Sequence, residues 1–186
     1  MTTVVGESTP FNLALIATGG TIEKTYDPHQ GSLQNTESIL EEILAGLVID
    51  HLVVHRLSVM SKDSLDMTEE DHVLIAATAI EESARHDGVV IVHGTDRLEQ
   101  TGETICRLAD GRVRTPIVLT GAMRPWILRN SDARQNITEA LLAVQLIPPG
   151  VHVSMHGRVL SFPGVVKDRK RLRFVRSDES QEEKPS

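Results

Sequence analysis

Short, almost wholly apolar runs alternate along this chain with longer amphipathic stretches, and this alternation limits the possible folds more than any other feature. The apolar runs are Leu13–Ile16, Leu52–Val54 with its neighbours, Val89–Val92, Pro116–Thr120 and Val151–Ser154. Runs that lack a polar face are typical of strands buried on both faces of a parallel sheet. The alternation therefore predicts an α/β fold with a doubly wound, mainly parallel sheet that helices cover on both sides.

The stretches between the apolar runs carry helix signals. Apolar side chains recur at helical spacing within residues 36–47, and Thr68 is followed by three acidic residues, the pattern of an N-cap and its first turn. The expected helices are 36–47, about 68–85, 98–108 and 132–146. Together with the strands, they form one continuous series of strand and helix units.

Composition and charge exclude several classes of function. The 186 residues contain 19 Lys plus Arg and 26 Asp plus Glu, which gives a formal charge of −7. An acidic chain with only 3% aromatic residues is a poor candidate for binding nucleic acid or an anionic membrane. The length and the 40% of hydrophobic residues suit one globular domain. We expect this domain to span residues 1–175.

The ends of the chain and its single cysteine favour a reducing compartment. Cys106 is the only cysteine, which excludes an internal disulfide framework and a thiolate zinc cage. The first 17 residues lack a basic region, and their apolar run is short for a signal peptide or a membrane span. We therefore expect an unexported, cytoplasmic protein. Residues 176–186 are polar, with more acidic than basic side chains, so a disordered acidic tail is expected there.

A basic run, KDRKRLR at residues 167–173, precedes this tail. One short basic run beside acidic residues is more often a solvated face or a contact between subunits than a nucleic-acid site.

Three polar loops with glycines follow the first, third and fourth expected strands. They are TGGTI at residues 18–22, HGTD at 93–96 and GAMRP at 121–125. Ligands of open α/β sheets bind beyond the carboxyl ends of the strands, where these loops converge. None contains a GxGxxG or GxxxxGK[ST] sequence, so a nucleotide site is the weaker interpretation. Threonine hydroxyls, an acid and glycine amides are instead suited to attack on a carbonyl, provided that a base such as lysine is near.

The spacing of the histidines does not predict a metal site. The pairs His51/His55 and His152/His156 have the spacing of helical zinc ligands, but on a strand four residues span about 13 Å. His93 ends a strand and is more often structural than a base in such a position. We expect no metal and no other cofactor.

The ordered motifs TGGTI, HGTDRLEQT and GAMRP resemble the signatures of the L-asparaginases. Further matches are Ser61-Lys62-Asp63, Ser131-Asp132 with Asn136, and a segment that ends at Lys167. The resemblance covers most of the chain up to about residue 168. It implies an amidohydrolase that converts L-asparagine to L-aspartate and ammonia through a threonine nucleophile.

The resemblance also implies roles for single residues. Thr21 would attack the side-chain amide, and Thr95, Asp96 and Lys167 would form a second catalytic group in which the lysine draws a proton from the threonine. Which threonine attacks first stays open. Tyr26 is similar to the tyrosine that orients the nucleophile, although it lies closer to Thr21 than in many relatives.

Substrate contacts follow from the same resemblance. Asp96 would accept hydrogen bonds from the α-ammonium, while Ser61 and loop amides, including those at Gly20 and Gly94, would hold the α-carboxylate. The backbone at Ala122 would lie beside the scissile amide. Each residue has a simpler alternative: Thr21 could end a turn, Asp96 could cap the helix that starts near Leu98, and Lys167 could be solvated.

Most members of the family are nearly twice as long as this chain and have a smaller C-terminal domain. We expect this chain to be a short, single-domain type without that domain, and a homodimer or homotetramer to complete its site. The alternatives are a glutaminase or related amidase, including the amidase subunit of archaeal glutamyl-tRNA amidotransferase, and a non-catalytic remnant that binds an amino acid.

Overall fold

A six-stranded sheet forms the centre of the protein, as the computed structural model shows for residues 9–19, 24–27, 32–35 and 38–179. Its strands, in spatial order, are β4 (Leu52–Ser58), β1 (Phe11–Ala17), β5 (Gly88–Val92), β6 (Pro116–Thr120), β7 (Gly150–Met155) and β8 (Arg158–Ser161). Neighbouring strands from β4 to β7 are parallel, and β8 pairs antiparallel with β7. The predicted α/β class with a mainly parallel sheet is confirmed.

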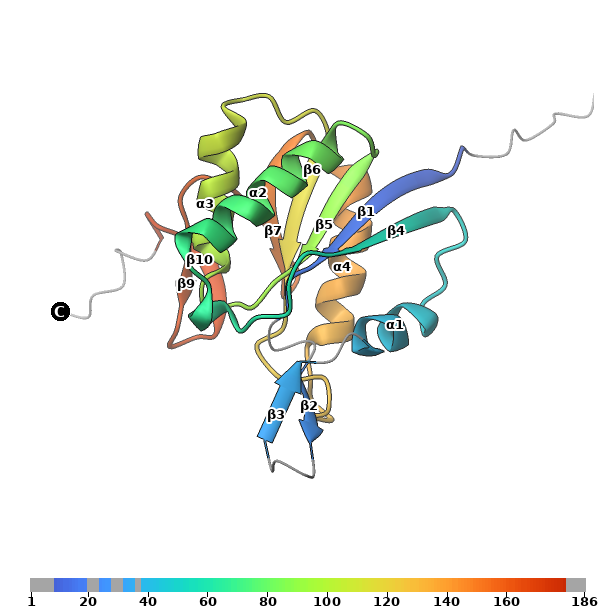
Figure 1. Ribbon diagram of the computed structural model, residues 1–186, viewed down its shortest axis with the longest axis vertical. Helices are drawn as coiled ribbons and strands as arrows, with labels where there is room; N and C mark the ends of the chain where they lie inside the picture. Colours follow the sequence, from blue (N-terminus) through green and yellow to red (C-terminus); the bar gives the residue numbers. More distant parts are fainter. Residues whose placement is uncertain (1–8, 20–23, 28–31, 36–37, 180–186) are drawn as a thin grey trace, which may run out of the picture.

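Helices cover both faces of the sheet (Figure 1). Helices α2 (Glu69–Ser83) and α3 (Leu98–Ala109) pack on one face, and α1 (Ser38–Ala45) and α4 (Ala133–Leu146) pack on the other. Alternate residues of β1 belong to the two cores: Ala14 and Ile16 contact the first pair of helices, and Leu13 and Leu15 the second. Both faces of β5 are buried, and every residue of this strand after Gly88 is apolar.

The helix signals of the sequence correspond to real helix ends. Thr68 caps α2 in a capping box: its hydroxyl accepts a hydrogen bond from the amide of Asp71, whose side chain accepts one from the amide of Thr68. Helix α1, in contrast, ends at Ala45, before the expected end at Leu47, and residues 36–37 lie outside the described residues.

Two hairpins lie outside the predicted alternation. Strands β2 (Lys24–Asp27) and β3 (Ser32–Asn35) form the first hairpin, between β1 and α1. Strands β9 (Val165–Asp168) and β10 (Arg173–Arg176) form the second hairpin, so the basic run 167–173 spans two strands and their turn.

The structured part of the chain extends past residue 175. Arg176 belongs to β10, the amide of Ser177 donates to the carbonyl of Gly164, and Arg158 pairs with Glu179. These residues lie in the segment whose composition indicated a disordered tail.

The strand order locates the natural place for a ligand. Strands β4, β1, β5, β6 and β7 follow the order 2-1-3-4-5, so the direction in which strands are added reverses between β1 and β5. In sheets of this order, ligands bind beyond the carboxyl ends of these two strands, which here are Ala17 and Val92. Within the part of the chain that the structure describes, no helix is long and apolar enough to cross a membrane.

Candidate active site

The loops that follow β1, β4, β5 and β6 are bonded to one another at the switch point. The amide and hydroxyl of Thr18 both donate to the carbonyl of Val92, at 3.2 and 3.0 Å. The amide of Lys62 donates to the carbonyl of Thr18, and the amide of His93 donates to that of Thr120. The predicted convergence of the polar loops on one sheet edge is therefore present.

Two glycines permit this close approach. A Cβ atom on Gly94 would lie 2.6 Å from the Oγ of Ser64, and one on Gly121 would lie 2.3 Å from the carbonyl oxygen of His93. A real Cβ atom does not come so close to a carbonyl, so only glycine brings the 121–125 loop this near to the 93–96 loop.

Replacement of Gly121 by alanine is therefore expected to push the two loops apart. Because the conflict is with backbone, side-chain rotation cannot relieve it, and we expect a loss of about 2 kcal/mol in the free energy of unfolding. Denaturant titration measures this loss. Gly157→Ala is the comparison, since a Cβ atom there meets nothing within 4 Å, although its φ of 72° adds some strain. Equal stability of Gly121→Ala and the wild type would contradict the close approach.

The structure brings together Thr95, Asp96 and Lys167, although the lysine lies far from the other two in the sequence. The Nζ of Lys167 lies 2.8 Å from the Oγ of Thr95 and 2.9 Å from Oδ1 of Asp96. Thr95 is buried, and the Lys167 side chain is only 6% exposed. The simpler alternatives for two of these residues are wrong: Lys167 is not solvated, and Asp96 bonds to the lysine while Arg97 occupies the N-cap position of α3.

Helix α3 holds the strand that carries Lys167. Oε2 of Glu99 accepts a hydrogen bond from the backbone amide of Lys167, and Oε1 of Glu103, one turn later, accepts one from the amide of Gly164. Burial raises the pKa of Glu99, while the Lys167 amide and the nearby cations act in the opposite direction. Neither glutamate was among the residues predicted from the sequence, although their spacing of four residues places them on one helix face.

A second cation contacts Asp96. Nη1 of Arg169 lies 3.0 Å from the same Oδ1 that bonds to Lys167. Arg169 is mostly exposed, so this pair is weaker than the buried one. One residue of the basic run thus belongs to the rim of the site, and Lys167 to its interior.

The remaining candidate residues differ in what the structure says of them. Ala122 is buried in the loop after β6, and Ser61 is exposed in the loop after β4. Tyr26 lies in β2, where its backbone pairs with Leu33 of β3. Gly20 and Thr21 lie outside the described residues.

His93 is buried directly before the HGTD loop turns. Its Nδ1 lies 2.7 Å from the carbonyl oxygen of Gly94, and its Nε2 lies 2.8 Å from the hydroxyl of Thr101, which also contacts His72. Burial lowers the pKa of His93 to about 4, and the neighbouring His72 acts in the same direction. A neutral imidazole bonded on both sides has a structural role, which is the interpretation that the sequence favoured.

No group of three or more His, Cys, Asp or Glu side chains among the described residues is arranged to hold a metal ion. The absence of a metal from this protein stays a prediction of the sequence.

Comparison with known proteins identifies the chain. A family model described as Asparaginase, N-terminal matches residues 12–173. The chain belongs to the asparaginase family. Its curated relatives include an L-asparaginase from Thermococcus kodakarensis, 32% identical over 151 residues, which cover 80% of this chain and 45% of the relative. They also include a glutamyl-tRNA(Gln) amidotransferase subunit from Thermoplasma acidophilum, 30% identical over 77% of this chain and 35% of the relative.

Solved structures give the same fold. The thermostable L-asparaginase of T. kodakarensis superposes with a TM-score of 0.73 at 27% identity, over 84% of this chain and 47% of that one. L-asparaginase I of Vibrio cholerae superposes with a TM-score of 0.73 at 22% identity, over 90% of this chain and 52% of that one. This asparaginase-family chain thus spans about half the length of the L-asparaginases it matches, and the resemblance seen in its motifs is confirmed.

Proposed function

We propose that this asparaginase-family chain is an amidohydrolase that converts L-asparagine to L-aspartate and ammonia without a cofactor. The observation that carries the proposal is the position of the Lys167 Nζ, within hydrogen-bond distance of both the Thr95 hydroxyl and the Asp96 carboxylate. A buried lysine between a hydroxyl and a carboxylate is the arrangement that activates a weak nucleophile.

The reaction would have two steps. A threonine oxygen, assigned to Thr21, forms a bond to the side-chain amide carbon of the substrate, and the C–N bond then breaks. Ammonia leaves with the proton that the hydroxyl gave up, and a β-aspartyl ester remains. Water then attacks the ester, which releases L-aspartate and restores the hydroxyl. Lys167, as the free amine, would take the proton of Thr95 and return it, and Tyr26 would help to orient Thr21.

Substrate selection would rest on the ends of a free amino acid. Lys167 and Arg169 both bond to Oδ1 of Asp96. The other carboxylate oxygen, Oδ2, would face the α-ammonium group. Ser61 and the amides of Gly20 and Gly94 would hold the α-carboxylate, and the backbone at Ala122 would lie beside the amide. A peptide-internal asparagine would lose both end contacts.

A second candidate is an amidase acting on glutamine or on a glutamine-like group. One methylene changes binding by only about 1–3 kcal/mol, and the matched relatives include a subunit of a glutamyl-tRNA(Gln) amidotransferase.

We further propose that the protein is a cytoplasmic homodimer or homotetramer. A solved relative described as a probable cytoplasmic L-asparaginase, from Campylobacter jejuni, is 27% identical over 84% of this chain and 48% of that one, with a TM-score of 0.67.

Ammonia release by the purified protein from L-asparagine, L-glutamine and N-acetyl-L-asparagine tests the proposal. We expect kcat/KM to be highest for L-asparagine and at least about tenfold lower for the acetylated compound, because acetylation removes the charge that pairs with Asp96. Higher kcat/KM for L-glutamine would favour the second candidate. No release from either free amino acid would favour a module that only binds one.

A further inference from the structure

The loop after β6, which contains Ala122, is held in place by a carboxylate that is not among the proposed catalytic or substrate-binding groups. Oδ2 of Asp132 accepts a hydrogen bond from the amide of Met123 at 3.0 Å, and Oδ1 accepts one from the amide of Arg124 at 2.9 Å. The two amides directly follow Ala122 in the chain, so this carboxylate determines where the loop backbone lies.

Two further side chains hold the carboxylate itself. Nδ2 of Asn136, one turn along α4, lies 2.8 Å from Oδ2 of Asp132, and Nε2 of His156, in the turn between β7 and β8, lies 2.7 Å from the same oxygen. Asn136 also donates to the carbonyl of Gly121 and accepts from the amide of His156. Residues 121–124, the start of α4 and the β7–β8 turn are thus joined at one point.

Asp132 does not serve as a helix cap. It stands at the N-cap position of α4 but forms no side-chain capping bond there. The amide of Ala133 donates instead to the hydroxyl of Ser131. An aspartate at this position usually accepts a hydrogen bond from a backbone amide in the first turn of its own helix. The carboxylate of Asp132 instead points toward the loop, which helix capping does not explain.

The charge of Asp132 is retained despite burial. The side chain is 11% exposed, and burial alone would raise its pKa, but the amides of Met123 and Arg124 and the side chain of His156 together lower it. A charged acceptor bonded to two amides is stronger and better defined in geometry than a neutral one.

We propose that Asp132 is a positioning residue for amide hydrolysis, which orients the backbone at Ala122 through the amides of Met123 and Arg124 and is itself held by Asn136 and His156. This inference rests on the proposed function, since the loop is assigned to the scissile amide there. Groups that face developing charge in a transition state act through accurate placement, and a small displacement lowers kcat more than it weakens binding of the substrate ends.

Asp132→Asn tests the proposal. Asparagine keeps the size of the side chain but replaces one acceptor oxygen with an NH₂ group that faces a donor. We expect kcat for L-asparagine to fall by on the order of 10-fold to 100-fold, while the Kd for L-aspartate changes by less than about threefold. The Kd reports on the substrate-end contacts, which the proposed function assigns to other residues.

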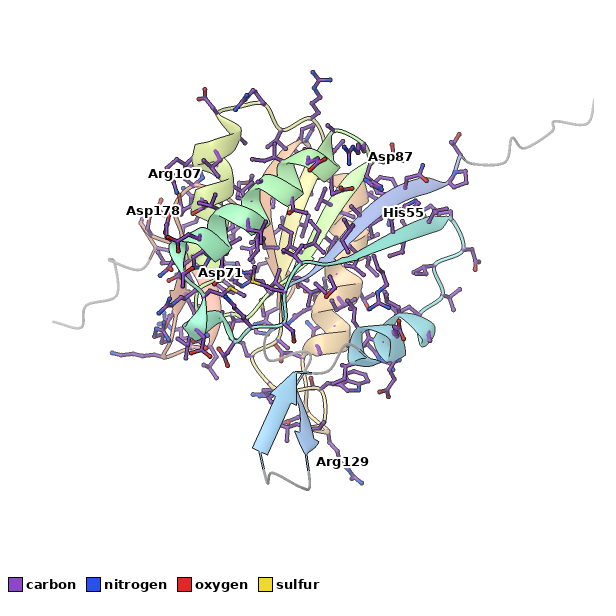
Figure 2. All side chains as sticks on the ribbon, viewed as in Figure 1. His55, Asp71, Asp87, Arg107, Arg129 and Asp178 are labelled. Carbon is purple, nitrogen blue, oxygen red and sulfur yellow. The ribbon has the colours of Figure 1, made fainter. Side chains whose placement is uncertain are left out.

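Asp87→Asn is the matched control. Oδ2 of Asp87 accepts from the backbone amide of Asn12 at 2.8 Å, so the same type of bond is weakened. Figure 2 shows Asp87 at the end of the molecule opposite to Arg129, which lies in the segment between the GAMRP loop and α4. We expect this variant to lose stability but to keep kcat within about twofold of the wild-type value.

Amide hydrogen exchange tests whether Asp132 holds the loop backbone, separately from whether the position of this loop matters for catalysis. In the wild type, the amides of Met123 and Arg124 are expected to be protected, and in Asp132→Asn to exchange at least about tenfold faster. Protection lost together with kcat supports the proposal. A wild-type kcat in folded Asp132→Asn overturns it, as do unprotected amides in the wild type. Protected amides in a wild-type protein that releases no ammonia would overturn the proposed function and, with it, the positioning role of Asp132 in the reaction.

Discussion

Lys167→Met is expected to abolish nearly all ammonia release, with a fall in kcat of about 10³-fold. Methionine has a similar length and fills the same buried space, but it has no nitrogen to bond to Thr95 or Asp96. Because the Lys167 Nζ bonds directly to the Thr95 hydroxyl, the substitution removes the group proposed to accept its proton. The loss corresponds to about 4 kcal/mol in activation free energy.

Thr95→Val is expected to lower kcat by a similar factor. Valine has nearly the same shape as threonine, so the substitution removes only the hydroxyl that bonds to Lys167. The double variant should lose little more than either single one, because residues that act as one group are not additive. Independent, additive losses would contradict a shared catalytic role.

Lys170→Met is the control for the change of residue type. Lys170 lies in the turn of the same hairpin and is exposed, and its backbone amide donates to Asp168. Its replacement is expected to leave kcat within about twofold of the wild-type value. Loss of activity in this variant would mean that the hairpin, and not the Lys167 amine, is what the reaction requires. Urea titration of all variants shows whether the lost activity follows lost folding.

The fold was predictable because short-range patterns in the sequence indicate most of its helices and parallel strands. Each of the five parallel strands is indicated by an apolar run such as Val89–Val92, and α2 is indicated by the cap at Thr68. The later hairpin was not predictable: β10 contains only Phe174 and Val175 as apolar residues, between arginines. Their burial comes from packing with distant elements, which short-range patterns do not record.

The site was predictable only in part, for a similar reason. The motifs assign Thr95, Asp96 and Lys167 through their resemblance, but their mutual distances depend on β9, which the alternation did not include. The groups that support the site were missed for one common reason. Glu99 bonds to a backbone amide 68 positions away and His156 to a carboxylate 24 positions away, and neither partner is visible in the local sequence.

Acid is expected to destabilise the protein through His93, because this histidine is buried and neutral in the folded state. In the unfolded chain the ordinary pKa is 6.5, whereas burial lowers the pKa in the folded protein to about 4. Between these values the unfolded chain binds a proton that the folded one does not. The contribution of His93 to the free energy of unfolding is therefore fully present above about pH 6.5 and falls as the pH decreases toward 4.

His93→Gln isolates this contribution from that of other titratable groups. Burial also lowers the pKa values of His72 and His152, so the wild type should lose stability steeply in acid. Glutamine forfeits some stability at every pH because it cannot reproduce both bonds of the imidazole, to Gly94 and Thr101. The decisive quantity is therefore the difference in unfolding free energy between pH 8 and pH 5, measured by urea titration.

That difference should be about 2 kcal/mol smaller in His93→Gln than in the wild type, because the variant has no proton to bind at this position in either state. His51→Gln, at an exposed histidine, controls for the substitution itself. An unchanged difference in His93→Gln would mean that His93 is protonated in the folded protein at pH 5, which its burial between the end of β5 and α3 makes energetically costly.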